Sequence, residues 1–196
     1  MCPVAVLFSG NAKQAGACTT PEELTSAVQD SLYDCDWLPF ERFEDSLTKI
    51  KGSELRLHGE RYRVLVVPPT EGITVKTLEK ARNFFEAGGV VVGYGRLPTH
   101  SLTLGTGAAG IAALRSEIWG ADARQGPGAC RTNTRGGRSY YLSGQPTPDE
   151  LTAALADARV PPVVRVTAGE TDGWVHAVRR VDREGREVLL LANQNT

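Results

Sequence analysis

The sequence is poor in histidine and aromatic residues, and its few cysteines are scattered. It has 3 His residues, 4 Cys residues and 7% aromatic residues in a chain of 196. The cysteines (Cys2, Cys18, Cys35 and Cys130) show no CxxC spacing, and the histidines form no HxH or HExxH pattern. These absences exclude recognisable zinc motifs and the dense disulfide framework of a small secreted domain. We expect no metal site and free thiols, with two disulfides as the alternative.

An excess of charge of either sign is also missing, and so is a long apolar run. Lys and Arg total 22 against 23 Asp and Glu, a net charge of −1 that gives no electrostatic basis for binding nucleic acid or an anionic membrane. The opening apolar run, residues 3–8, lacks a basic n-region and is too short for a signal sequence or a membrane span. We expect a cytoplasmic protein, with a secreted parent protein as the alternative.

One local basic cluster interrupts this neutral balance. Arg131, Arg135 and Arg138 lie close together in the sequence, separated by Asn133 and by the glycine pair at 136–137. Runs of like charge usually form a solvated face. We therefore interpret the cluster as a solvated loop in preference to a phosphate site.

Apolar runs of strand length alternate with amphipathic stretches over residues 1–158. Strands are predicted at 3–8, 36–42, 54–67 (a hairpin with its turn at 58–60), 90–94 and 138–142. Helices are predicted at 19–33, 74–87, 108–119 and 148–158. Strands that alternate with helices favour an α/β domain with a doubly wound, mostly parallel sheet.

The pattern changes after Pro161 to consecutive strand-like runs. These runs cover residues 163–168, 173–181 and 186–193, with a tight turn at Asp182–Gly185. They predict a C-terminal antiparallel β extension over 159–196, either the start of a truncated β-sandwich or a strand addition. One or two hairpins bury little surface by themselves. We therefore expect an exposed apolar patch that a partner sheet covers.

The stretch VVVGYG, residues 90–95, is a buried strand that runs into a glycine corner. In α/β hydrolases such a corner carries Ser or Cys as the nucleophile, with a His partner and backbone N–H donors for the oxyanion. Here Tyr94 stands between Gly93 and Gly95, and its ordinary pKa of about 10 leaves little of it ionised near neutral pH. We predict a structural corner and no catalytic residue.

Loops at the carboxyl ends of the strands are the candidate ligand site of such a sheet. Ser9-Gly10-Asn11 follows the first strand, but the hydroxyl-rich pattern of an FMN loop and a Gly-Lys-Ser or Gly-Lys-Thr motif are missing, so no cofactor is expected. The candidate ligand-binding set is Ser9, Gly10, Asn11, Gly93, Tyr94, Gly95 and Arg96.

Cys18 and the tryptophans are further candidates for chemistry. Cys18 precedes a predicted helix start, yet no His has a recognisable claim to be its partner. Trp37, Trp119 and Trp174 could stack on sugar rings, but we favour a core or an inter-domain seam for each, with Trp174 as the best exception.

Specific motifs resemble those of a known family. The segment at 59–69 (GERYRVLVVPP) is followed by FEAGG at 85–89 and GRLPT at 95–99. Together they resemble the flavodoxin-like, class I glutamine amidotransferase-like domain beside the catalytic barrel of large glycoside hydrolases of the alpha-L-rhamnosidase type, with a similar domain in some beta-galactosidases. Residues 174–195 resemble the strand pair that opens the next β-sandwich domain.

The resemblance implies a non-catalytic accessory domain, because the catalytic carboxylates of such enzymes lie in the barrel. It implies a structural or interface role, packing on that barrel or self-association through the C-terminal strands, and contact with carbohydrate. Two alternatives stay open: a standalone amidotransferase-like or esterase-like hydrolase that uses Cys18, and a small-molecule binding module at the carboxyl ends of the strands.

Overall fold

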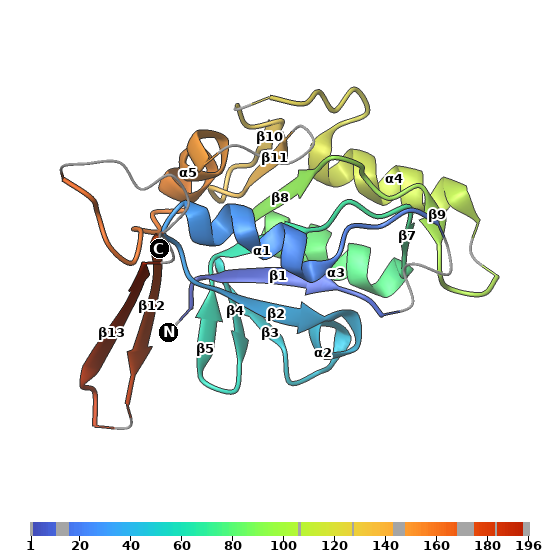
Figure 1. Ribbon diagram of the computed structural model, residues 1–196. Helices are drawn as coiled ribbons and strands as arrows, with labels where there is room; N and C mark the ends of the chain where they lie inside the picture. Colours follow the sequence, from blue (N-terminus) through green and yellow to red (C-terminus); the bar gives the residue numbers. More distant parts are fainter. Residues whose placement is uncertain are drawn as a thin grey trace.

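A six-stranded, mostly parallel sheet forms the centre of the molecule (Figure 1). The computed structural model describes residues 2–10, 16–105, 107–126, 128–142, 148–167, 175–182 and 184–193. The sheet has the order β10-β11-β8-β6-β1-β2, and every neighbouring pair is parallel except β10 and β11. Its strands are β1 (Val4–Phe8), β2 (Cys35–Pro39), β6 (Val64–Val67), β8 (Val90–Tyr94), β10 (Arg131–Thr132) and β11 (Arg138–Leu142).

Both faces of this sheet are buried, which explains the continuous apolar runs of its central strands. Side chains alternate between the faces: Val4 and Val6 enter one core, whereas Ala5 and Leu7 enter the other. Helices α1 (Pro21–Asp30) and α5 (Pro148–Asp157) cover the first core. The second core is covered by α2 (Phe40–Glu44), α3 (Val75–Glu86) and α4 (Ala108–Trp119).

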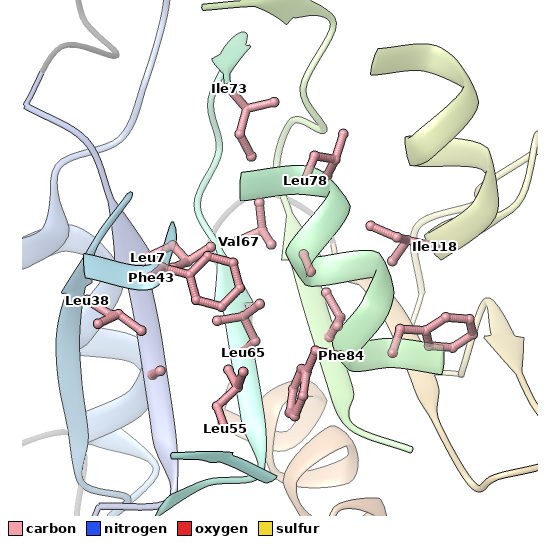
Figure 2. Close-up of a cluster of buried hydrophobic side chains, with 14 of the residues drawn as sticks. Leu7, Leu38, Phe43, Leu55, Leu65, Val67, Ile73, Leu78, Phe84 and Ile118 are labelled. Atoms are coloured by element: carbon pink, nitrogen blue, oxygen red, sulfur yellow. The ribbon is translucent and has the colours of Figure 1, made fainter. Parts of the chain in front are cut away.

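Figure 2 shows the second core, where Leu7, Leu65 and Val67 of the sheet point toward α3. The amphipathic spacing of α3 places Leu78 and Phe84 in this core, and both are fully buried. Helix α3 begins as the sequence predicts, because the Thr74 side chain accepts a hydrogen bond from the Thr77 N–H at 3.1 Å.

Smaller sheets border the central one. The strands β3 (Lys49–Lys51), β4 (Glu54–Leu57) and β5 (Glu60–Tyr62) form an antiparallel meander, and β7 (Gly72–Ile73) pairs with β9 (His100–Ser101). The predicted hairpin at 54–67 is confirmed in its turn, where His58 and Gly59 take φ of 48° and 95°. Its second arm, however, divides at Arg63, because residues 64–67 leave the hairpin and join the central sheet.

The last two strands form an antiparallel hairpin of β12 (Val175–Val181) and β13 (Glu187–Asn193), which projects away from the sheet in Figure 1. Arg180 ties it to the body through an ion pair with Asp34, with Nη1 and Oδ2 2.6 Å apart. Every residue of β13 is exposed. A hairpin with so little buried surface needs further contacts to be stable.

Two predicted strands differ from the structure. The strand predicted at 36–42 ends at Pro39, and Phe40 begins α2. The helix forms here because it places the side chains of Phe40 and Phe43 in the core. Residues 163–167 form no strand; Val163 donates its N–H to the Leu32 carbonyl at 2.8 Å, so the backbone at Val163 is bonded to the turn after α1 and not to a sheet. Residue 168 lies outside the described residues.

The described cysteines are all free, as the simplest interpretation of the sequence predicts. The described helices include none with the length and apolar character that crossing a membrane requires.

Candidate functional site

The glycine corner after β8 is filled by protein and leaves no space for a ligand at Gly93. A Cβ placed on Gly93 would lie 2.6 Å from the Leu97 side chain and 2.9 Å from the Trp119 ring. Trp119 is fully buried, and its indole N–H donates to the Tyr140 carbonyl at 2.9 Å. Glycine is therefore required here so that α4 can pack closely on the sheet.

The backbone donors of the corner are used inside the protein. The Gly95 N–H donates to the Leu142 carbonyl at 3.0 Å, and the Arg96 N–H donates to the Tyr94 carbonyl at 2.7 Å. The Gly95 carbonyl accepts from the side chains of Gln125 and Tyr141. An oxyanion hole needs N–H groups that point at a reacting oxygen, and these two already have partners.

Tyr94 lies in the core that α1 and α5 cover. Its side chain is 2% exposed, and its hydroxyl has no hydrogen-bond partner among the described residues. Burial raises the pKa of Tyr94 well above its ordinary value, because ionisation would place a charge in an apolar environment. The hydroxyl therefore stays protonated and cannot act as a base near neutral pH.

A cavity of about 420 Å³ lies at the carboxyl ends of β1 and β6. The chain places β2 on one side of β1 and the later strands β6, β8 and β11 on the other side. The strand order therefore reverses between β1 and β6, and open α/β sheets bind ligands at such a point. Its lining combines apolar and polar side chains: Phe8, Ser9, Gly10, Cys18, Thr19, Thr20, Glu22, Trp37, Phe40, Pro68 and Thr70.

Trp37 is the most distinctive side chain of this cavity. Its side chain is 46% exposed although it lies on a strand of the central sheet, because β2 is an edge strand. The Phe8 ring meets it edge-on, with ring centroids 6.2 Å apart. An exposed indole held in place by a second ring offers a flat apolar surface to a ligand. A core or seam position, favoured for Trp37 from the sequence, does not describe this exposed side chain, because its place on an edge strand makes it a wall of the cavity.

Glu71 connects the loops at this edge. Its carboxylate pairs with the Arg96 guanidinium and accepts the Ala17 N–H at 3.2 Å, while its own N–H donates to the Ala17 carbonyl at 3.1 Å. The chain near Cys18 is fixed in the same way, since the Thr19 N–H donates to the Pro69 carbonyl at 2.9 Å. No motif in the sequence points to Glu71, because its partners come from distant segments.

The structure divides the predicted ligand set. Ser9 and Gly10 line the cavity, whereas Arg96 is half-exposed in the network around Glu71 and does not line it. Gly93 and Tyr94 pack inside the protein, and Gly95 is hydrogen-bonded to β11. Asn11 lies outside the described residues, and so does Trp174, the tryptophan singled out as an exception.

Cys18 lines the cavity and is partly buried, but the histidines lie elsewhere. His58 forms the β4–β5 turn, His100 lies in β9 with Nδ1 2.8 Å from the Thr99 hydroxyl, and His176 lies on β12. None of the three lines the cavity beside Cys18. In the part of the chain that the structure describes, no group of three or more His, Cys, Asp or Glu side chains is arranged to hold a metal ion.

The fold defines an α/β domain of a class that occurs within longer glycoside hydrolases. The rhamnosidase from Novosphingobium sp. PP1Y shares it with a TM-score of 0.58 and 19% identity, over 98% of this chain and 17% of that chain. The beta-galactosidase from Rahnella sp. R3 matches with a TM-score of 0.66 and 16% identity, over 100% of this chain and 36% of that chain. The beta-galactosidase from Bacillus circulans sp. alkalophilus matches with a TM-score of 0.65 and 15% identity, over 99% and 36%.

The sequence defines the family more narrowly. The model of glycoside hydrolase family 106, described as alpha-L-rhamnosidase, matches residues 6–196, so the chain belongs to this family. No protein of curated function matches the chain. The chain spans only 17% and 36% of the rhamnosidase and Rahnella beta-galactosidase structures that it resembles, so it corresponds to a part of those longer proteins.

Proposed function

We propose that the chain acts as a non-catalytic accessory domain, with a structural or interface role, of a glycoside hydrolase that acts on carbohydrate. Family membership supports the carbohydrate context. The internal hydrogen bonds of the glycine corner support the non-catalytic role, because the two N–H groups at Gly95 and Arg96 already have acceptors. We also infer a flavodoxin-like, doubly wound fold, since the parallel strands β1, β2, β6, β8 and β11 have the spatial order 2-1-3-4-5. A class I amidotransferase-like relationship and a cytoplasmic location stay predictions.

The observation that carries the interface role is the apolar exposure of β13 on both of its faces. In the register of the hairpin, Leu189 and Leu191 lie on one face and Leu190 lies on the other, and they are 47%, 59% and 61% exposed. A strand that is apolar on both faces is typical of the buried interior of a sheet. An exposed apolar patch of this kind marks a protein–protein contact.

Two partners fit this surface: the catalytic barrel domain of a parent glycoside hydrolase, and a second copy of the chain. Sedimentation velocity of the purified chain separates them. Self-association predicts a dimer or larger species that Leu190→Asp makes monomeric. Leu104→Asp, at a side chain that is 99% exposed outside the hairpin, is the control and should leave the mass unchanged.

The non-catalytic role is tested by assaying the same chain on 4-nitrophenyl α-L-rhamnoside, 4-nitrophenyl β-galactoside, glutamine and a 4-nitrophenyl ester. We expect no turnover above buffer, because none of the described histidines lines the cavity beside Cys18. Turnover that disappears in Cys18→Ala would contradict the proposal and would support the hydrolase alternative.

A second candidate function is ligand binding in the cavity beside Trp37. Its exposed indole, the hydroxyl groups of Ser9 and Thr19, and the Glu22 carboxylate form an apolar surface with a few polar groups, which is the usual composition of a small-molecule site. In this family context we propose a sugar as the ligand.

Binding is measured by thermal unfolding with rhamnose, galactose, glutamine, FMN and nucleotides. A sugar at a hundred times its Kd stabilises the fold by about 2.7 kcal/mol, and Trp37→Ala should remove that shift. Leu47→Ala, at another exposed apolar side chain that does not line the cavity, is the control. A shift with FMN or nucleotides alone, or one that survives Trp37→Ala, would contradict the sugar site.

A further inference from the structure

A second cavity, of about 400 Å³, lies at the amino ends of the central strands, where β6, β8 and β11 begin. Four arginines from three segments of the chain line it: Arg63 before β6, Arg135 and Arg138 of the β10–β11 hairpin, and Arg159 after α5. Of these four, only Arg135 and Arg138 lie close together in the sequence. Arg131, the third member of the cluster expected from the sequence, instead donates to the carbonyls of Ser116 and Glu117.

The positive charge of this cavity is only partly neutralised. Among the described residues that line it, Asp157 is the only one with a carboxylate, which pairs with Arg138 at 2.8 Å and accepts the Tyr140 hydroxyl. The nearest acid to Arg63 is Glu54 at 3.8 Å, and Glu54 is closer to Arg56, at 2.9 Å.

Arg135 and Arg159 form no ion pair with any carboxylate in the described segments. Since the whole chain has a net charge of −1, this concentration of cations is a local feature. Guanidinium groups bind oxyanions through paired N–H donors.

Arg159 also has an unusual backbone conformation. Its φ is 55°, in the left-handed region that favours glycine, directly after the end of α5. The Val160 N–H donates to the Leu155 carbonyl at 3.0 Å, which is the bond that closes a helix where glycine is the usual residue. A strained residue that is not glycine is more common at functional sites. The helix dipole stabilises a cation at a helix C-terminus. This stabilisation is compatible with a binding function of the Arg159 side chain.

We propose that this arginine cavity binds a small molecule that carries a phosphate, sulfate or carboxylate group. The cavity is larger than a bare anion, so the rest of the ligand occupies the remaining volume beside Ser53 and the glycine backbone at Gly88 and Gly136. The site lies at the other end of the strands from the cavity beside Trp37, and it does not depend on the function proposed for the domain.

Isothermal titration of the whole chain at low salt tests this site, with inorganic phosphate, inorganic sulfate and glucuronate as probes and rhamnose as the neutral control. We expect saturable binding of at least one anion, weakened by added NaCl because screening reduces the attraction. Arg135→Gln and Arg159→Gly should each weaken it about tenfold or more, the loss typical of one ionic hydrogen-bonding partner. Arg124→Gln removes an exposed cation elsewhere and should leave the affinity unchanged.

Arg159→Gly separates binding from folding, because glycine accommodates the left-handed backbone and should raise the melting temperature while it weakens binding. Binding of phosphate or sulfate identifies an ester of those acids as the ligand class, and binding of glucuronate alone identifies a carboxylate. The proposal is overturned if the folded chain binds none of the three anions, or if binding survives both cavity substitutions, or if Arg124→Gln weakens it to the same degree.

Discussion

At the scale of single residues, Tyr94 shows how a side chain in a glycine corner can be structural. Its hydroxyl is buried and has no hydrogen-bond partner in the segments that the structure describes. An unpaired buried polar group costs about 1–3 kcal/mol, so its presence weakens the fold. The Tyr94 hydroxyl therefore lowers the stability of the described structure.

Tyr94→Phe should leave the free energy of unfolding unchanged or raise it by about 1 kcal/mol, because the substitution removes only the unpaired hydroxyl. Tyr140→Phe is the matched control: its hydroxyl donates to Asp157, so its loss should destabilise the protein by about 1 kcal/mol. Urea unfolding of the two variants measures both effects. A Tyr94→Phe variant less stable than Tyr140→Phe would show that the hydroxyl has a partner.

Asp36 is a second residue whose environment can be tested, through pH. Burial raises the pKa of Asp36, and the nearby Glu60 and Asp34 raise it further, against the hydrogen bond from the Tyr62 hydroxyl at 3.2 Å. Because the folded pKa exceeds the unfolded one, the folded state binds this proton more tightly. Asp36 therefore favours folding below its unfolded pKa of 3.8, and that contribution is lost as pH rises through the folded value.

Asp36→Asn should consequently stabilise the protein relative to the native chain at neutral pH, with the difference shrinking toward pH 3. Asparagine retains an acceptor for the Tyr62 hydroxyl. Urea unfolding of both proteins between pH 3 and 7 measures the difference, with the exposed Asp122→Asn as the control. A variant that loses stability relative to the native chain as pH rises would contradict the assignment.

At the scale of elements, the β12–β13 hairpin meets the body through the Arg180–Asp34 ion pair and the buried Ala177 of β12. Arg180 reaches the nearly buried Asp34 carboxylate, whereas its neighbour Arg179 pairs with Glu187 inside the hairpin. Successive residues of a strand point to opposite faces. Arg180 therefore contributes to attachment of the hairpin to the body, whereas Arg179 contributes to the hairpin itself.

Arg180→Gln should increase hydrogen exchange along β12, because it leaves Asp34 without its cation and loosens the hairpin from α1. Arg179→Gln, an exposed pair within the hairpin, should change exchange much less and cost at most about 1 kcal/mol. Equal exchange in the two variants would mean that apolar contacts, such as that of the buried Ala177, hold the hairpin.

At the scale of the whole molecule, the two cavities lie at opposite ends of the parallel strands of one sheet. The cavity beside Trp37 lies where parallel strands end, and the arginine cavity lies where they begin. In a parallel sheet all strands present the same end at each edge, so loops that are distant in sequence gather there. The outward hairpin adds a third surface, which is apolar and suited to a partner protein.

The local sequence determined the elements that depend on near neighbours. The apolar run at 90–94, the period of α3 with Thr74 as its cap, and the bounds of α4 and β11 follow from side chains within a few positions of one another. The family, too, was recognisable from short motifs at turns and strand ends.

Only the tertiary structure decided what depends on contacts between distant segments. It moved residues 64–67 from a hairpin arm to the central sheet, exposed Trp37 at a sheet edge, and joined Arg63 and Arg159 to Arg135 and Arg138. Periodicity reports which face of an element is apolar, but it carries no information on which other element covers that face. The cavities of this protein are made by those pairings, so they could be located only in the folded chain.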